Sequence, residues 1–156
     1  MKIYHKNEWV SVDANDARLK DCNIFIGRDT VIEQNTWIEQ DAWIEQDAVI
    51  KQDVVIKRGA VIGQGARIEQ GARIGQSAVI GQDAVIGQDA KIEQDAVIER
   101  DAWIGQDARI EQNAVIGQGA VIDTILIYKP GKFRVLLCNN KIAIGCQLKT
   151  AEQWGG

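Results

Sequence analysis

The sequence predicts an all-β fold built from one repeated six-residue unit, and three observations support this prediction. Isoleucine occurs at every sixth position from Ile26 to Ile122, without an insertion. Each repeat holds a short extended run such as Ala84-Val85-Ile86, whose side chains alternate between two sides of a strand. The pair between two runs, such as Gln82-Asp83, ends in a residue that tolerates positive φ. A period of six fits neither a helix nor a simple alternating strand, so a repeat architecture is expected.

The corner between two runs predicts a coil with flat faces. Its second residue is Asp, Asn or Gly in every regular repeat except the one with Ser77. Small alanines and bulky isoleucines would fill the inside together, with one repeat on each face. Three faces close a triangular coil of eighteen residues, so the seventeen isoleucines predict five to six coils. Stacked corner glutamines, such as Gln70, Gln88 and Gln106, are expected to form amide ladders.

The pattern Ile-Gly/Glu-x-x-Ala-x, which fills residues 24–124, resembles the hexapeptide-repeat family. This resemblance implies a left-handed parallel β-helix, a fold that hosts many activities. The best-known members of this family are acyltransferases. The resemblance therefore implies a histidine on one coil that acts as a general base, and a loop extruded from the coils. Here the only histidine is His5, outside the repeats, and the repeat never breaks to form a loop. We therefore predict no catalytic residue, no metal site and no cofactor, although a carboxylate base remains open.

Residues 1–23 are predicted to form an N-terminal cap, because a β-helix leaves unpaired backbone at its ends. Ile3 to Val12 could form a small hairpin. A degenerate coil around Leu19, Cys22 and Ile24 would follow it and lead into the repeats.

Residues 125–156 are predicted to form a C-terminal hairpin and a short helix. Pro130, within this segment, marks the boundary between the repeats and the hairpin. Alternating apolar residues flank Asn139-Asn140, which predicts that Leu137 lies opposite Ile142, and Phe133, Val135, Ile144 and Cys146 continue the same register. Thr150 to Gln153 has the form of a capping box, so a short helix carrying Trp154 is expected. The segment from Ile144 to Trp154 also resembles a tail of uncharacterised phage and prophage proteins.

Composition indicates a protein without a membrane span or a nucleic-acid site. The net charge is −4, and the chain has no run of twenty apolar residues. The mixed N-terminus MKIYHKNEWV shows no signal peptide, which predicts a cytoplasmic location. Three cysteines without metal-ligand spacing are expected to be reduced thiols.

The outward positions separate the three predicted faces. One is apolar throughout and is our predicted oligomer interface: Trp43, Val61, Val79, Val97 and Val115. The second is basic over three coils: Trp37, Val55, Arg73, Lys91 and Arg109. The third is mixed: Val31, Val49, Arg67, Val85, Trp103 and Val121. The alternative for the apolar face is that strands favour valine on their outer side, and the alternative for the basic face is a charge-balanced solvated surface.

The leading prediction for function is a non-enzymatic structural or interaction protein. It would be a rigid β-helix scaffold that self-associates, with a trimer favoured, and it could be associated with phage. A second prediction is a small-ligand-binding or acyltransferase-like trimer with its site between subunits. A third is a phage-encoded inhibitor of a host protein or small signalling molecule. The predicted partner surface consists of Trp37, Arg73, Lys91, Arg109 and Trp154.

Overall fold

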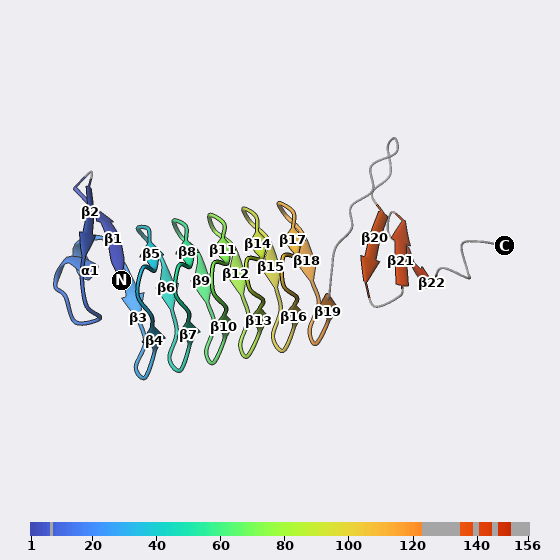
Figure 1. The fold of residues 1–156 in the computed structure, drawn as a ribbon, viewed down its shortest axis with the longest axis horizontal. Coiled ribbons are helices and arrows are strands. Elements are labelled where there is room, and N and C mark those ends of the chain that lie inside the picture. The colour runs from blue at the N-terminus through green and yellow to red at the C-terminus, as the bar shows by residue number, and fades with distance from the viewer. Residues whose placement is uncertain (7, 123–134, 139–140, 145–146, 151–156) are drawn as a thin grey trace.

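The computed structural model describes residues 1–6, 8–122, 135–138, 141–144 and 147–150, with side chains up to residue 122. Seventeen two-residue strands, β3 to β19, follow one another at intervals of six residues from Phe25 to Ile122. Each pairs in parallel with the strand three places on, so successive coils stack along one axis (Figure 1). This is the predicted left-handed parallel β-helix of five to six coils.

Three parallel sheets form the sides of the prism, and we name each by its outward side chains. The apolar face contains β3 (Phe25–Ile26), β6 (Trp43–Ile44), β9 (Val61–Ile62), β12 (Val79–Ile80), β15 (Val97–Ile98) and β18 (Val115–Ile116). The basic face contains β5 (Trp37–Ile38), β8 (Val55–Ile56), β11 (Arg73–Ile74), β14 (Lys91–Ile92) and β17 (Arg109–Ile110). The mixed face contains β4 (Val31–Ile32), β7 (Val49–Ile50), β10 (Arg67–Ile68), β13 (Val85–Ile86), β16 (Trp103–Ile104) and β19 (Val121–Ile122).

The interior is the predicted stack of isoleucine and alanine. The isoleucines from Ile38 to Ile110 and the alanines between them are almost completely buried. Thr36, at an alanine position, is also fully buried, and its hydroxyl donates to the carbonyl oxygen of Glu33 at 2.8 Å. A buried hydroxyl with a backbone partner avoids the cost of an unpaired polar group.

The corners take the predicted left-handed conformation. Their second residues have φ between 53° and 72°, whether they are Asp, Asn, Ser77 or Gly. From Asp41 to Gly119, the amide of each corner residue bonds to the coil before it, as when Asp83 N–H donates to the carbonyl oxygen of Gln64 at 2.9 Å. The amide ladders are not formed as predicted, because Gln88 Nε2 donates instead to Asp89 Oδ2 at 3.0 Å.

The N-terminal end contains the predicted hairpin, formed by β1 (Lys2–His5) and β2 (Glu8–Ser11). Strand β1 also pairs in parallel with β5, so it extends the basic face by one strand and places Ile3 in the core below Ile38. The predicted degenerate coil is present in part, because Leu19, Cys22 and Ile24 are buried and Asp41 N–H donates to the carbonyl oxygen of Cys22 at 3.0 Å. The segment also contains a one-turn helix, α1 (Arg18–Asp21), which was not predicted.

A separate sheet near the C-terminus contains β20 (Val135–Cys138), β21 (Lys141–Ile144) and β22 (Gln147–Thr150). The hairpin register is the predicted one, with Leu137 opposite Ile142 and Val135 opposite Ile144. The third strand, β22, was not predicted, and it pairs antiparallel with β21. The predicted Phe133–Cys146 pair and the helix carrying Trp154 lie outside the described residues, and the division into three domains stays a prediction.

Candidate functional site

The apolar face exposes one column of large hydrophobic side chains. Sheet register places Trp43, Val61, Val79, Val97 and Val115 on adjacent strands, as predicted. Trp43 is 48% exposed and Val115 is 65% exposed. Phe25 also belongs to this column, because β3 pairs with β6 and the two rings stack with centroids 4.2 Å apart. The eighteen-residue spacing could have found Phe25, one coil before Trp43.

Several residues at the corner that follows this column are glycines, so no side chain projects from the surface there. An added Cβ at Gly81 would lie 2.5 Å from the backbone nitrogen of Arg100. Backbone hydrogen bonds are correspondingly short there: Gly81 N–H donates to Ile98 O at 2.7 Å, whereas Glu99 N–H donates to Ile116 O at 2.9 Å. The coils therefore approach most closely where the corner has no side chain.

A hollow of about 400 Å³ lies at the N-terminal end of the apolar face. Its lining combines the stacked rings with polar corner groups: Phe25, Gly27, Arg28, Trp43, Glu45, Gln46 and Gln64. A hollow with an aromatic wall and a polar rim can receive an apolar side chain from another molecule.

The basic face carries three cations on adjacent strands. Arg73 lies beside Lys91, and Lys91 beside Arg109. Arg109 is neutralised by Glu93, with Nη2 and Oε1 2.8 Å apart. Among the described residues, no carboxylate lies within ion-pair distance of Arg73 or Lys91. Like charges directly opposite in a sheet are destabilising, so an anion between these two side chains would relieve repulsion.

A depression of about 300 Å³ follows these cations along the face. Gly75 forms a gap in its border, between the longer corner side chains Lys57 and Glu93. Lys57 was not predicted as a site residue, and its Nζ donates to Glu39 Oε1 at 2.7 Å. The complete lining is Lys57, Arg73, Ile74, Gly75, Lys91, Glu93 and Arg109.

Trp37, predicted as part of a partner surface, is partly covered by the N-terminal end. The Trp9 ring packs edge-on against it at 4.6 Å, and Lys2 Nζ lies 4.7 Å from its centroid. The structure therefore joins Trp37 to the hairpin, while Arg73, Lys91 and Arg109 stay together. Trp154 lies outside the described residues.

His5 lies on the N-terminal hairpin. Its Nε2 atom is buried without a hydrogen-bond partner and lies 3.5 Å from Asp21 Oδ2. Cys22 is a buried free thiol whose Sγ donates to the carbonyl oxygen of Tyr4 at 3.3 Å, and burial raises its pKa. No cluster of three potential metal ligands occurs within the described part of the chain.

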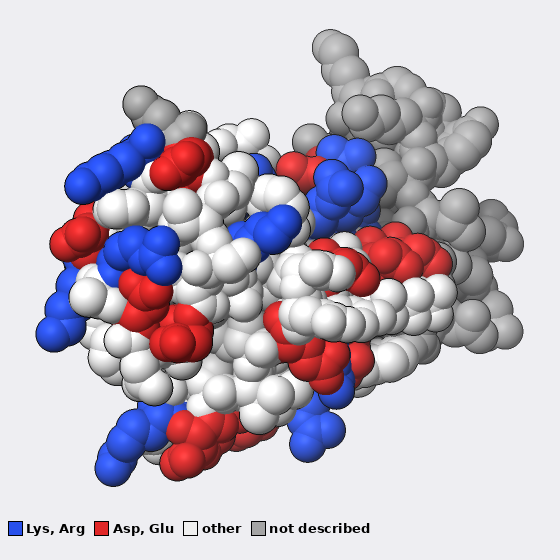
Figure 2. Space-filling model, turned by 60° about the vertical axis from the view of Figure 1, so that its left-hand side comes forward, with Lys and Arg blue, Asp and Glu red and all other residues white. Residues whose placement is uncertain are grey.

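Charges of both signs alternate over the side shown in Figure 2, with uncharged surface between them. Ion pairs between neighbouring coils, such as Lys51 with Glu33 at 2.9 Å and Arg58 with Asp41 at 3.0 Å, bring the two signs together. Neither sign forms a continuous field over this side. No helix among the described residues is long and apolar enough to span a membrane.

Residues 35–70 match the family model described as bacterial transferase hexapeptide (six repeats). The predicted resemblance to the hexapeptide-repeat family is thus confirmed over these residues. No curated protein sequence matches the chain. The likeness of the C-terminal tail to phage proteins finds no support in these comparisons.

Several solved acyltransferases share similarity with the chain. A mutant of GDP-perosamine N-acetyl transferase from Caulobacter crescentus, in complex with CoA and GDP-perosamine, is 17% identical with a TM-score of 0.56, covering 66% of this chain and 53% of that chain. UDP-N-acetylglucosamine acyltransferase from Campylobacter jejuni is 16% identical with a TM-score of 0.36, covering 79% and 70%. The chain thus spans about half the length of the first protein. Identity this low shows a shared fold and does not assign an activity.

Proposed function

We propose that the chain is an acyltransferase-like β-helix protein that self-associates and binds a small anionic ligand between its subunits. The observation that carries this proposal is an exposed apolar column on one face beside an incompletely neutralised row of cations on the next. Exposed apolar patches of this kind usually mark an interface. The column from Phe25 to Val115 is accordingly the proposed seam of a homo-oligomer, with a trimer favoured.

The two faces meet at one corner of the prism. The segment from Lys57 to Ala60 leads from β8 on the basic face to β9 on the apolar face. When the apolar face packs against another protomer, this corner borders the cleft between the two subunits. Arg73 and Lys91 then supply donors and positive charge to a ligand in that cleft.

The comparisons favour this reading over the predicted non-enzymatic scaffold. The matching family model is one of bacterial transferases, and the first compared structure is an acetyltransferase in complex with CoA. CoA carries phosphate groups, which are the kind of anion that a lysine and an arginine in register can bind. The activity and its acyl acceptor are proposals for this chain.

The scaffold remains the second candidate because of where the histidine lies. His5 is on the N-terminal hairpin, and residues 24–122 contain no histidine that could act as a general base. A ligand could therefore bind between subunits without any transfer taking place. Binding and turnover must be measured separately.

Calorimetry with CoA at low ionic strength tests ligand binding. Arg73→Gln should weaken CoA binding several-fold, because it removes a cation without an ion-pair partner. Arg67→Gln is the matched control, since Arg67 has the same place in its repeat on the mixed face. An oligomer that does not bind CoA, or equal losses in both variants, would contradict the acyltransferase-like proposal.

Release of free thiol from acetyl-CoA, measured with a panel of amine and hydroxyl acceptors, separates the two candidates. Turnover with any acceptor supports transfer. Tight CoA binding without thiol release would support a ligand-binding scaffold instead.

A further inference from the structure

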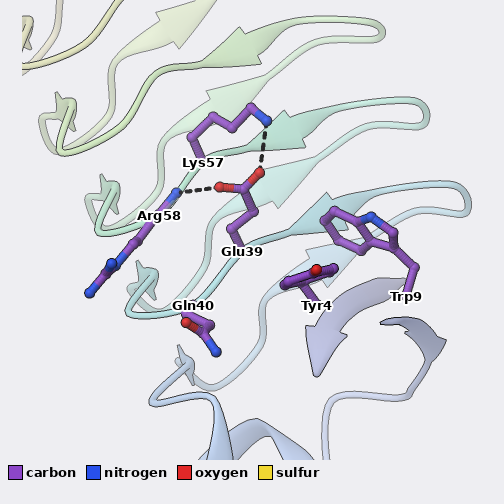
Figure 3. Close-up of a pocket in the computed structure, with 6 residues that line it drawn as sticks. All are labelled: Tyr4, Trp9, Glu39, Gln40, Lys57 and Arg58. Atoms are coloured by element: carbon purple, nitrogen blue, oxygen red, sulfur yellow. Dashed lines mark hydrogen bonds and ion pairs between the residues drawn. The ribbon is translucent and has the colours of Figure 1, made fainter. Parts of the chain in front are cut away.

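A third hollow, of about 460 Å³, lies between the N-terminal hairpin and the start of the basic face (Figure 3). Its volume falls in the range typical of small-molecule sites. Six side chains line it: Tyr4, Trp9, Glu39, Gln40, Lys57 and Arg58. It shares only Lys57 with the depression along the basic row, so it is a separate candidate site.

Strand register forms the aromatic wall of this pocket. Because Ile3 pairs with Ile38, the next outward residue, Tyr4, comes beside Glu39. Tyr4 lies opposite Trp9 in the hairpin, with ring centroids 5.3 Å apart. Trp9 is held in turn by its edge-on contact with Trp37. Two fixed rings, each about one third exposed, therefore offer apolar surface to a ligand.

The polar side of the pocket has more free donors than free acceptors. Glu39 accepts from Lys57 Nζ at 2.7 Å and from the backbone N–H of Arg58 at 3.1 Å, so both of its oxygens are engaged (Figure 3). Arg58 uses its Nε to bond Asp41, which leaves its terminal nitrogens available. Lysine has three N–H donors, and Lys57 uses one of them on Glu39.

This imbalance decides which kind of ligand suits the pocket. Aromatic rings beside a carboxylate could hold a cation, but Glu39 is already paired and two cations flank it. A carboxylate or phosphate group would instead accept from the Gln40 amide and a free terminal nitrogen of Arg58. We propose that this pocket binds a small anion carrying a planar aromatic ring, with the ring against Tyr4 and Trp9.

Three matched probes test the proposal on the full chain by calorimetry and saturation-transfer NMR. Indole-3-acetate has both the ring and the anion, indole-3-acetamide has the same shape without the charge, and acetate has the charge without the ring. Indole-3-acetate should bind at least tenfold more tightly than either of the others. Equal binding of the acetate and acetamide forms of indole would overturn the proposal, as would no binding of indole-3-acetate.

Two substitutions place the ligand groups. Arg58→Gln should weaken indole-3-acetate binding about fivefold and leave indole-3-acetamide unchanged. The fold should tolerate it, because glutamine is the usual residue at this position of the repeat. Arg100→Gln, at the same position on another corner, is the control. Equal effects of the two substitutions would overturn the site.

Trp9→Leu should weaken binding of the ring, whereas Trp103→Leu on the mixed face should not. Circular dichroism would confirm that each variant keeps its β-helix. If the Trp9 variant does not fold, the Arg58 and Arg100 pair still decides the proposal. None of these results depends on CoA binding at the basic row, so this inference can fail while the proposed function stands.

Discussion

The apolar and basic faces of the prism have the same backbone and the same interior but different outer surfaces. Val79 and Arg73 occupy equivalent places one repeat apart, and each is followed by a fully buried isoleucine. One face exposes hydrophobic side chains, and the other exposes cations. The difference shows that the inward residues specify the coil, while the outward residues are free to specify contacts.

The substitutions with the largest expected effect on stability test whether the interior is the same behind both faces. Ile80→Ala behind the apolar face and Ile74→Ala behind the basic face each remove a fully buried side chain. Each should lower the free energy of unfolding by about 3 kcal/mol in urea denaturation. The comparison fails if the two losses differ by more than about 1 kcal/mol.

A substitution with a smaller expected effect on stability tests why glycine occurs at the corner beside the apolar face. Gly81→Ala would place a Cβ 2.5 Å from backbone of the next coil, so it should cost about 2 kcal/mol. Gly117→Ala is the control on the same corner, since the nearest described atom to its added Cβ would be Glu99 Oε2 at 3.9 Å. Thermal denaturation would measure both, and equal stability of the two variants would contradict the close-approach explanation.

A substitution with a still smaller expected effect on stability tests whether the cations of the basic face repel one another. Lys91→Glu would place a carboxylate between Arg73 and Arg109. This change should stabilise the fold by about 0.5 kcal/mol, and the gain should shrink in high salt. Urea denaturation at two salt concentrations would show it. A loss of stability at low salt would mean that Arg73 and Lys91 do not repel each other.

The last test lies outside both faces, at the N-terminal end. Hydrogen bonds from the Arg18 side chain and backbone lower the pKa of Asp16 from 3.8 to about 2. A lowered folded-state pKa stabilises the fold above about pH 4, and this contribution disappears as the pH falls toward 2. NMR titration of the Asp16 carboxyl group should therefore give a midpoint near 2. A midpoint near 4 would show that the pair with Arg18 is absent in solution.

The sequence was sufficient to predict the coil because one pattern determines it. Buried isoleucines, left-handed corner residues and eighteen-residue stacking all follow from the six-residue period, as Ile80 and Asp83 illustrate. The period contains no information about the non-repeating N-terminus. The pairing of β1 with β5, and thus the covering of Trp37 by Trp9, could not be predicted from it.

The candidate sites were predicted only in part, for a similar reason. Spacing alone placed Arg73, Lys91 and Arg109 in one row. It could not show that Glu93 neutralises Arg109 rather than Lys91, because that depends on side-chain direction at a corner. The same limit explains the glutamine ladders, since Gln88 turns toward Asp89.

Native mass spectrometry of the Val79→Glu variant tests the central claim most directly. The wild-type protein should be an oligomer, and a charge buried at the centre of the apolar seam should convert it to a 17.3 kDa monomer. Val85→Glu, at the equivalent position on the mixed face, should remain an oligomer. A monomeric wild type, or equal dissociation of the two variants, would contradict the assignment of the apolar face as the seam.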